Sequence, residues 1–344
     1  MKALLCCILL LPFSIGCESI VFPPEASTSA TAIFDDFWKE FDVHYALFEV
    51  HDIDWQQLND NYRPFIYDGM PDSVLFSYLD SLIQPLHDGH VNILGYFDGK
   101  FHSSISKRLY SDTTRYANFH DVSSFYLKST AASAGYGNII YGTIRDSIGY
   151  IYLPTFSESS STYNWSEQFE QVISALSFTK GLVLDVRGND GGTSENASKI
   201  ASFFTKDAQV ALYAEFKSGP GHNSFESAEA FTLTPSSSIH YYKPVALLTD
   251  RYSISAAEWF TLMMKTLPNV THIGDTTHGS FSGRLDRELA NGWIYSLSLE
   301  RVTDKDHISY EGRGIPPDIT IHIKERDPVI SKDSILDVAL QHLR

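Results

Sequence analysis

The amino-acid sequence predicts an α+β protein with an α/β core and a small helical domain in front of it. Aromatic residues recur at helical spacing over residues 33–48, which indicates an amphipathic helix. From residue 148 onward, apolar β-branched runs alternate with helix-like stretches, as in α/β sheets with crossover helices. With 344 residues, 43% of them hydrophobic, the chain can bury one large core or two medium ones.

The N-terminal residues have the pattern of an export signal. A lysine is followed by an apolar run, residues 3–13, that is too short to span a membrane comfortably. Cys17 comes directly after a small residue, as at a bacterial lipoprotein cleavage site, although Ser14 stands where leucine is usual. We expect a signal peptide over residues 1–16 and a lipid on Cys17. A plain secretory peptide with an incidental cysteine is the alternative.

Charge and cysteine content limit the partners and the stabilising chemistry. The formal net charge of −16 argues against nucleic acid or anionic lipid as the main partner. Cys6 and Cys7 lie in the expected signal peptide and Cys17 would carry lipid, so we expect no disulfide and a fold stabilised by burial. The expected location is a bacterial membrane, with the protein anchored and facing the periplasm or the cell surface.

The folded part is expected to begin with helices. Residues 17–31 are rich in Ser, Pro, Ala and Thr and are predicted to form a tether. Residues 32–86 are predicted to form the helical domain, whose aromatic stripe is typical of a core. Its predicted breaks are prolines, namely Pro64, Pro71 and Pro85.

The remaining residues, 87–344, are predicted to form the α/β domain. Apolar runs predict strands over residues 91–94, 148–153, 181–187, 209–214 and 244–248. Helical spacing predicts helices over residues 166–178, 195–204 and 256–267. The predicted strands over residues 209–214 and 244–248 are expected to continue the same α/β sheet. Functional sites in such sheets lie beyond the carboxyl ends of the strands.

Ser255 follows a predicted strand and precedes a predicted helix. A serine in that place faces unpaired backbone N–H groups, which can hold an oxyanion. Ser255 and Glu258 also match a capping box, which satisfies helix-end donors and involves no chemistry. His87 and His90 lie in one turn, but no third ligand has a recognisable spacing, so we expect no metal and no cofactor.

Four ordered motifs resemble those of the tail-specific, or C-terminal-processing, serine peptidases and their tricorn-core relatives. They are Asp185 to Gly192 (DVRGNDGG), Ser255 to Glu258 (SAAE), Gly274 to Gly279 (GDTTHG) and Glu311 to Asp318 (EGRGIPPD). The resemblance covers residues from His90 to the C-terminus and implies a crotonase-like α/β core. The roughly 50 residues between Leu94 and Ile148 are too few for the PDZ module inserted in many relatives.

The resemblance also implies a branch within that family. The processing peptidases use a serine–lysine dyad, and Ser280 stands where that lysine would be. In the tricorn-like branch the base is a histidine near the start of the catalytic region, assisted by a glutamate, and His90 and Glu311 stand at the matching places. Ser255 needs such a base near neutral pH. A further serine, Ser253 or Ser282, could lie between Glu311 and the imidazole.

Backbone N–H groups of Gly191 or Gly192 and of Ala256 are the expected oxyanion donors, because glycine permits a close backbone approach. Three alternatives stay open. Glu311 could be an ordinary surface carboxylate, His278 could replace His90 as base, and Asp185, Arg187 and Asn189 could brace the turn without reacting.

We expect a serine peptidase that cleaves peptides or proteins through an acyl-enzyme on Ser255, without metal or other cofactor. Two other functions fit the same residues. A binding lipoprotein could keep the fold without turnover, and an esterase or amidase could use the same triad.

Overall fold

The computed structural model describes residues 26–106, 123–127, 130–145, 147–158, 164–236, 239–321 and 333–344. The expected signal peptide, Cys17 and most of the expected tether lie outside these residues. Within the described ranges, no helix is both long enough and apolar enough to cross a membrane.

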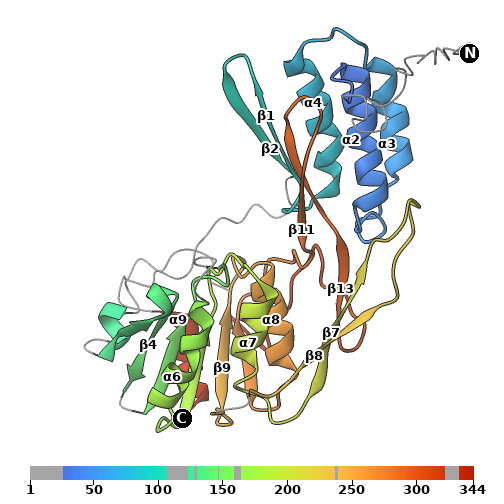
Figure 1. The fold of residues 1–344 in the computed structure, drawn as a ribbon. Helices are drawn as coiled ribbons and strands as arrows, with labels where there is room; N and C mark the ends of the chain where they lie inside the picture. The colour runs from blue at the N-terminus through green and yellow to red at the C-terminus, as the bar shows by residue number, and fades with distance from the viewer. Residues whose placement is uncertain are drawn as a thin grey trace, which may run out of the picture.

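Three helices form the upper part of the molecule in Figure 1. They are α2 (Ala30–His44), α3 (Trp55–Tyr62) and α4 (Asp72–Ile83). The side chain of Ser29 caps α2 by accepting from Ala32 N–H, and Asp54 caps α3 by accepting from Gln57 N–H. The predicted aromatic stripe is confirmed as core: the Phe41 ring lies 5.4 Å from the Trp55 ring, centroid to centroid.

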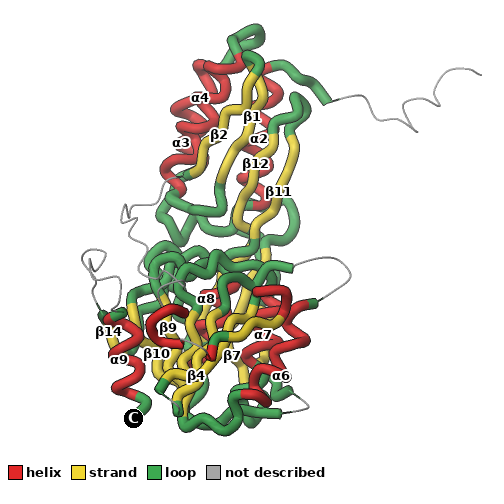
Figure 2. The backbone as a smooth tube through the Cα atoms, turned by 90° about the vertical axis from the view of Figure 1, so that its left-hand side faces the viewer, coloured by secondary structure: helices red, strands yellow, loops and turns green. Residues whose placement is uncertain are grey.

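A four-stranded antiparallel sheet packs against these helices and shares their core (Figure 2). Its order is β11 (Arg284–Glu288), β12 (Ile294–Ser298), β1 (Asn92–Phe97) and β2 (Lys100–Ile105). One hydrophobic cluster joins residues from α2 through β1 to β12, so it runs across the boundary predicted after residue 86. That boundary stays a prediction. We call these helices and this sheet the upper unit.

A seven-stranded sheet forms the centre of the lower unit. Its order is β14 (Ile319–Thr320), β10 (Val270–Gly274), β9 (Val245–Thr249), β6 (Gly181–Asp185), β5 (Ile148–Tyr152), β4 (Ile139–Ile144) and β3 (Ala132–Ala134). The five strands from β14 to β5 pair in parallel, and β4 and β3 pair antiparallel. Every residue of β6 and β9 is buried, which explains their unbroken apolar runs.

Helices cover the lower sheet and supply the crossovers. They are α6 (Phe169–Ala175), α7 (Ser194–Ala201), α8 (Ala256–Lys265) and α9 (Ser334–His342). Short helical turns lie at Arg63–Phe65, Gln84–Leu86, Ser123–Leu127, Gly135–Gly137 and Trp165–Gln168. The predicted strands and helices of this region are confirmed, with shifts of a few residues at their ends.

One strand belongs to a different sheet from the one predicted, so that prediction is wrong. The run at residues 209–214 is a strand, β7 (Gln209–Phe216), but it does not join the parallel sheet. It is the middle strand of a separate three-stranded sheet, between β13 (Glu300–Asp304) and β8 (Glu229–Leu233). Pairing with β13, far along the chain, decides its sheet, and no local pattern records that pairing.

Candidate active site

Ser255 lies at the end of the turn between β9 and α8. It is the N-cap residue of α8, and its backbone has φ 57° and ψ −118°. A residue with a side chain rarely adopts a positive φ, so the surrounding structure holds Ser255 in a strained conformation. Strained strand-to-helix turns of this kind present nucleophilic serines in hydrolases. The Glu258 half of the predicted capping box is also present: Ser255 N–H donates to Glu258 Oε2 at 3.2 Å.

The glycine-rich turn after β6 lies directly against Ser255. A Cβ added at Gly191, which has φ 91°, would come within 2.8 Å of Ser255 Cβ. Asn189 holds the turn against the Ser255 loop by two hydrogen bonds. Its backbone carbonyl oxygen accepts from Ile254 N–H at 2.9 Å, and its side-chain amide donates to Leu153 O at 2.9 Å. The turn therefore needs glycine where it meets the Ser255 loop.

Asp185 and Arg187 brace this turn. The guanidinium of Arg187 is fully buried and donates to Asp185 Oδ2 at 2.6 Å and to Asp333 Oδ2 at 2.8 Å. The structure thus favours the bracing interpretation of this pair. Asp250 adds a second tie, because its Oδ1 accepts from Gly188 N–H and Tyr252 N–H, each at 2.9 Å.

The predicted oxyanion donors are not equivalent. Gly191 N–H donates to Asn189 Oδ1 at 2.9 Å, so this hydrogen is already used inside the turn. Gly192 and Ala256 both line a cavity together with Ser255. Ala256 is the first residue of α8, where the N–H has no acceptor within the helix. The geometry therefore favours Gly192 and Ala256 over Gly191.

Glu258 has a larger role than a helix cap. It is fully buried, and its carboxylate accepts from Thr277 Oγ1 at 2.7 Å, from Ser280 N–H at 2.7 Å and from Gly279 N–H. With the bond from Ser255 N–H, one carboxylate fixes the Ser255 loop to residues 277–280. Such extensive pairing offsets the cost of burying a charge.

Glu311 accepts a hydrogen bond from the backbone N–H that follows the two bound by Glu258. Phe281 N–H donates to Glu311 Oε2 at 2.8 Å, so consecutive N–H groups of residues 279–281 serve first Glu258 and then Glu311. Gly312 N–H donates to Gly279 O at 2.9 Å and fastens the two loops together. Glu311 is only 7% exposed, which rules out the surface-carboxylate alternative.

His90 lies in the turn just before β1, in the upper unit. Its N–H donates to Asp88 Oδ1 at 2.8 Å, and its carbonyl oxygen accepts from Ser296 Oγ on β12 at 2.5 Å. Asp88 and Glu311 are brought near each other around Tyr45, whose pKa is raised by burial and further by the negative charges of both carboxylates. The sequence-distant segments that carry His90 and Glu311 thus share one neighbourhood.

The alternative residues lie in defined places. His278 contacts the Ser255 loop, since its N–H donates to Ser253 O and its Nδ1 contacts Arg251 O, each at 3.0 Å. The hydroxyl of Ser253 donates to Val186 O at 2.8 Å. The hydroxyl of Ser282 accepts from Glu300 N–H at 3.0 Å. Both serine hydroxyls therefore have structural partners of their own.

Ser255 opens onto a cavity of about 250 Å³. Four of its ten lining residues are aromatic, namely Phe216, Phe231, Trp259 and Phe281. A second cavity of about 510 Å³ adjoins it and shares three of its lining residues, Ser194, Phe231 and Trp259. The two cavities therefore lie side by side, and the smaller one contains Ser255.

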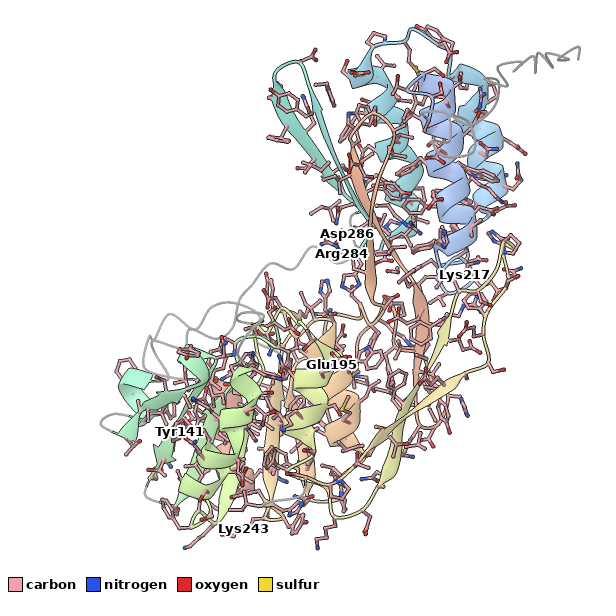
Figure 3. The ribbon with its side chains drawn as sticks, in the orientation of Figure 1. Tyr141, Glu195, Lys217, Lys243, Arg284 and Asp286 are labelled. Carbon is pink, nitrogen blue, oxygen red and sulfur yellow. The ribbon has the colours of Figure 1, made fainter. Side chains whose placement is uncertain are left out.

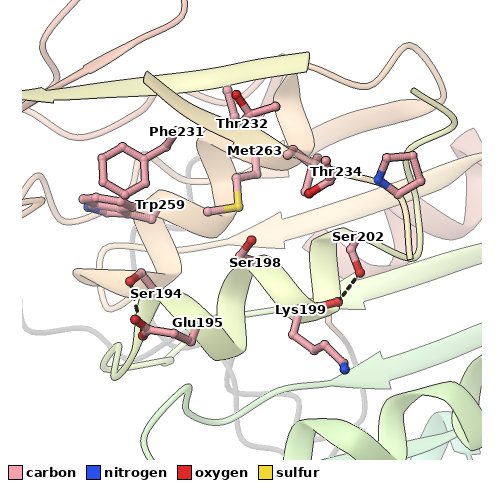
Figure 4. A pocket seen from close by; sticks show the side chains of 13 residues that line it. Ser194, Glu195, Ser198, Lys199, Ser202, Phe231, Thr232, Thr234, Trp259 and Met263 are labelled. Atoms are coloured by element: carbon pink, nitrogen blue, oxygen red, sulfur yellow. Dashed lines mark hydrogen bonds between the residues drawn. The ribbon is translucent and has the colours of Figure 1, made fainter. Parts of the chain in front are cut away.

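Figure 4 shows the larger cavity, where the hydroxyls of α7 face an apolar wall. Ser194 and Ser198 lie on the helix side, opposite Phe231, Trp259 and Met263. The Phe231 and Trp259 rings meet edge to face at 4.9 Å. Figure 3 places Glu195, at the start of α7, on the side of the lower unit that faces the upper unit. Adjoining cavities of mixed polarity can hold side chains of a bound peptide.

Over the described ranges, no group of three or more His, Cys, Asp or Glu side chains is placed to hold a metal ion.

Comparison with known proteins decides the family. The model of peptidase family S41 matches residues 147–321, and the tricorn protease C1 domain matches residues 27–80. The chain belongs to peptidase family S41. The predicted resemblance to the tail-specific peptidases and to tricorn is thereby confirmed.

Relatives within the family agree with this assignment. A putative peptidase from Parabacteroides merdae ATCC 43184 has a solved structure that superposes with a TM-score of 0.81 at 30% identity, covering 92% of this chain and 97% of that one. The carboxy-terminal processing protease CtpB of Bacillus subtilis (strain 168) is 31% identical over 184 residues, which are 53% of this chain and 35% of CtpB. This chain therefore matches only about a third of that relative's length.

The tricorn protease structure shares the fold with a TM-score of 0.54 at 15% identity, over 91% of this chain and 36% of tricorn. It supports the predicted α+β fold class with its small N-terminal helical region, and nothing beyond the fold.

Sequence reasoning missed two carboxylates of this region. The capping-box pattern gives Glu258 only a structural role, although Glu258 also belongs to the Ser255 motif. Glu300 lines the small cavity beside Ser255, and it gave no sequence pattern because it reaches the site through the pairing of β13 with β7.

Proposed function

We propose that this S41 family member is a serine peptidase that cleaves peptide bonds through an acyl-enzyme on Ser255. The observation that carries the proposal is the strained backbone of Ser255 at the N-terminus of α8, next to Gly192 and open to a cavity. Membership of the family supports hydrolysis of peptide bonds.

The proposed chemistry uses side chains from both units. Ser255 Oγ attacks the substrate carbonyl carbon while the imidazole of His90 takes the hydroxyl proton. Glu311 orients the imidazole and stabilises its cation. The carbonyl oxygen becomes an oxyanion held by the N–H groups of Gly192 and Ala256. The amine leaves with the proton from the imidazole. Water then attacks the ester carbonyl while His90 takes a proton from it, and the imidazole gives that proton to Ser255 Oγ as the carboxylic acid product leaves.

The choice of His90 over His278 rests on the neighbourhood of Glu311. Glu311 and Asp88, two residues before His90, both act on Tyr45. His278 Nδ1 is instead directed at a backbone carbonyl, that of Arg251. A catalytic imidazole needs a carboxylate partner to stabilise its cation, and Glu311 is buried close to the segment that carries His90.

The test of this function is labelling by a fluorophosphonate, followed by peptide mapping and turnover of matched peptide and ester substrates. We expect one adduct, on Ser255, and cleavage of peptides. No adduct, together with no turnover, would favour a binding protein that keeps the fold. Hydrolysis of esters alone would favour an esterase.

We further propose that the protein is exported and anchored by lipid on Cys17. The support is the apolar run ending at Cys17. Because multiple acyl chains hold a protein stably on a membrane, the mature protein should partition into detergent and the Cys17→Ala variant should not. Equal partitioning of the two proteins would contradict the anchor.

A further inference from the structure

The small cavity beside Ser255 contains one carboxylate among aromatic rings. Glu300, the first residue of β13, lines it together with Phe216, Trp259 and Phe281. Glu300 pairs in register with Phe216 of β7, so the strand pairing of the three-stranded sheet delivers both residues to the cavity. Glu300 is only 5% exposed.

The local structure holds this carboxylate in place without neutralising it. Gly283 N–H donates to Glu300 Oε1 at 2.5 Å, and a Cβ at Gly283 would come within 3.0 Å of the same oxygen. The Ser282 hydroxyl lies 3.5 Å from Glu300 Oε2. Burial raises the pKa of the Glu300 carboxyl, and these hydrogen bonds only partly oppose that effect.

The nearest basic residues along the strands are engaged elsewhere. Arg301 forms an ion pair with Glu49 at 2.9 Å and donates to Ala46 O at 3.0 Å. Lys217 donates to Gly221 O at 3.3 Å. Among the described residues, Glu300 forms no salt bridge. This differs from Arg187, which two carboxylates neutralise in the same unit.

A buried carboxylate without a cation is costly, and proteins keep such groups where a ligand supplies the partner. The aromatic walls suit the other end of the same ligand. Aromatic rings pack against the methylene stem of lysine or arginine and attract the cationic head. A cavity of about 250 Å³ has room for one long side chain.

We propose that this cavity binds the side chain of the substrate residue next to the cleaved bond, and that Glu300 makes the enzyme prefer lysine or arginine there. The inference rests on the proposed peptidase function, since it assigns a specificity to the same site. Glu300 is a specificity residue and takes no part in bond cleavage.

The test compares peptides that differ at one position, on either side of the cleaved bond, with lysine, arginine, norleucine or glutamate. Norleucine keeps the apolar stem of lysine and lacks its charge. For the unmodified enzyme we expect kcat/KM to be at least about tenfold higher with lysine or arginine than with norleucine, and lowest with glutamate. Equal or better cleavage of norleucine peptides would overturn the proposal without any variant.

Glu300→Gln keeps the acceptor for Gly283 N–H and removes the charge. We expect kcat/KM for lysine and arginine peptides to fall about tenfold or more, while that for norleucine peptides stays within about threefold. Glu215→Gln is the matched control, because Glu215 precedes Phe216 on β7 and so points to the opposite face. It should leave all ratios unchanged.

Fluorophosphonate labelling distinguishes a failure of the proposed Glu300 specificity from a failure of the proposed peptidase function. Normal labelling of Glu300→Gln on Ser255, with an unchanged preference between lysine and norleucine, would reject the role of Glu300 and leave the peptidase function standing. Absence of labelling and turnover in the unmodified protein would reject the peptidase function itself.

Discussion

The upper and lower units build their cores in different ways. The lower unit packs aliphatic strands that are neighbours in a parallel sheet, such as β6 and β9. The upper unit packs aromatic rings from α2 and α3 against strands β1 and β12, which are separated by most of the chain. Ser255 directly precedes Ala256 of the first core, and His90 directly precedes Val91 of the second.

This difference matters for the proposed chemistry. The proposed nucleophile, the glycine turn and α8 lie at one edge of the parallel sheet, whereas the proposed base, His90, is held by residues of the upper unit. Glu258 joins the Ser255 loop to residues 277–281, and Glu311 joins residues 277–281 to residues 311–315. We therefore expect mutations in the lower unit to affect the nucleophile, and mutations in the upper unit to affect its activation.

The largest expected effect is that of Ser255→Ala. Loss of the nucleophile should lower turnover by several powers of ten, as found for catalytic serines in general. Loss of a helix cap alone should cost only about 0.5–2 kcal/mol of stability. Turnover and thermal unfolding should be measured on the same preparations.

Ser255→Asn is the control for that experiment, because asparagine is a good cap and no nucleophile. It should be as inactive as Ser255→Ala and as stable as the unmodified protein. Retained fluorophosphonate labelling in Ser255→Asn, or an adduct on Ser253 or Ser282, would reduce residue 255 to a structural cap.

The next effect compares one histidine from each unit. His90→Ala should lower kcat by about three powers of ten or more, because the proposed mechanism transfers the serine proton to this imidazole alone. His278→Ala, on the lower unit, should keep most of the activity, and so should His87→Ala. A larger loss for His278→Ala would move the base into the lower unit and remove the division of labour between the units.

The aromatic core of the upper unit gives the third prediction. Phe41 is fully buried and stacks on Trp55 and Tyr295. Phe41→Ala should lower the free energy of unfolding by about 3–5 kcal/mol, since it leaves a cavity in a rigid core. Phe101→Ala serves as control, because Phe101 is 71% exposed, and should change it by less than about 0.5 kcal/mol. Denaturant unfolding measures both, and equal values would contradict the assigned core.

The smallest expected effect concerns Asp250 in the lower unit, whose pKa burial raises from 3.8 to about 6. Between these pH values the folded protein holds a proton that the unfolded chain has lost, so this carboxyl lowers stability as the pH rises through the window. Asp250→Asn removes that titration and keeps an oxygen acceptor for Gly188 N–H. The unfolding free energy of the variant, minus that of the unmodified protein, should therefore rise by about 2 kcal/mol from pH 4 to pH 6.

Unfolding in denaturant at several pH values tests this. A difference between the two proteins that does not change with pH would show that Asp250 does not titrate in this range.

Local sequence patterns were enough to predict the parts of the site that lie on neighbouring strands. The apolar runs of β6 and β9, the glycine turn after β6 and the serine before α8 are all contiguous features, and their parallel pairing brings them to one edge of the sheet. The physical reason is that burial on both faces forces a strand to be apolar throughout, and a tight approach forces glycine. The family resemblance carried the proposed pairing of Ser255 with His90 and Glu311, which no local pattern contains.

Only the tertiary structure decided what depends on distant pairing. The sheet of β7, the shared core of β1 and β12, the four donors around Glu258 and the arrival of Glu300 beside Ser255 all arise from contacts between segments far apart in the chain. A side chain's environment there is set by its spatial neighbours, and a single sequence records hydrophobic periodicity and turn chemistry but not which strands will pair.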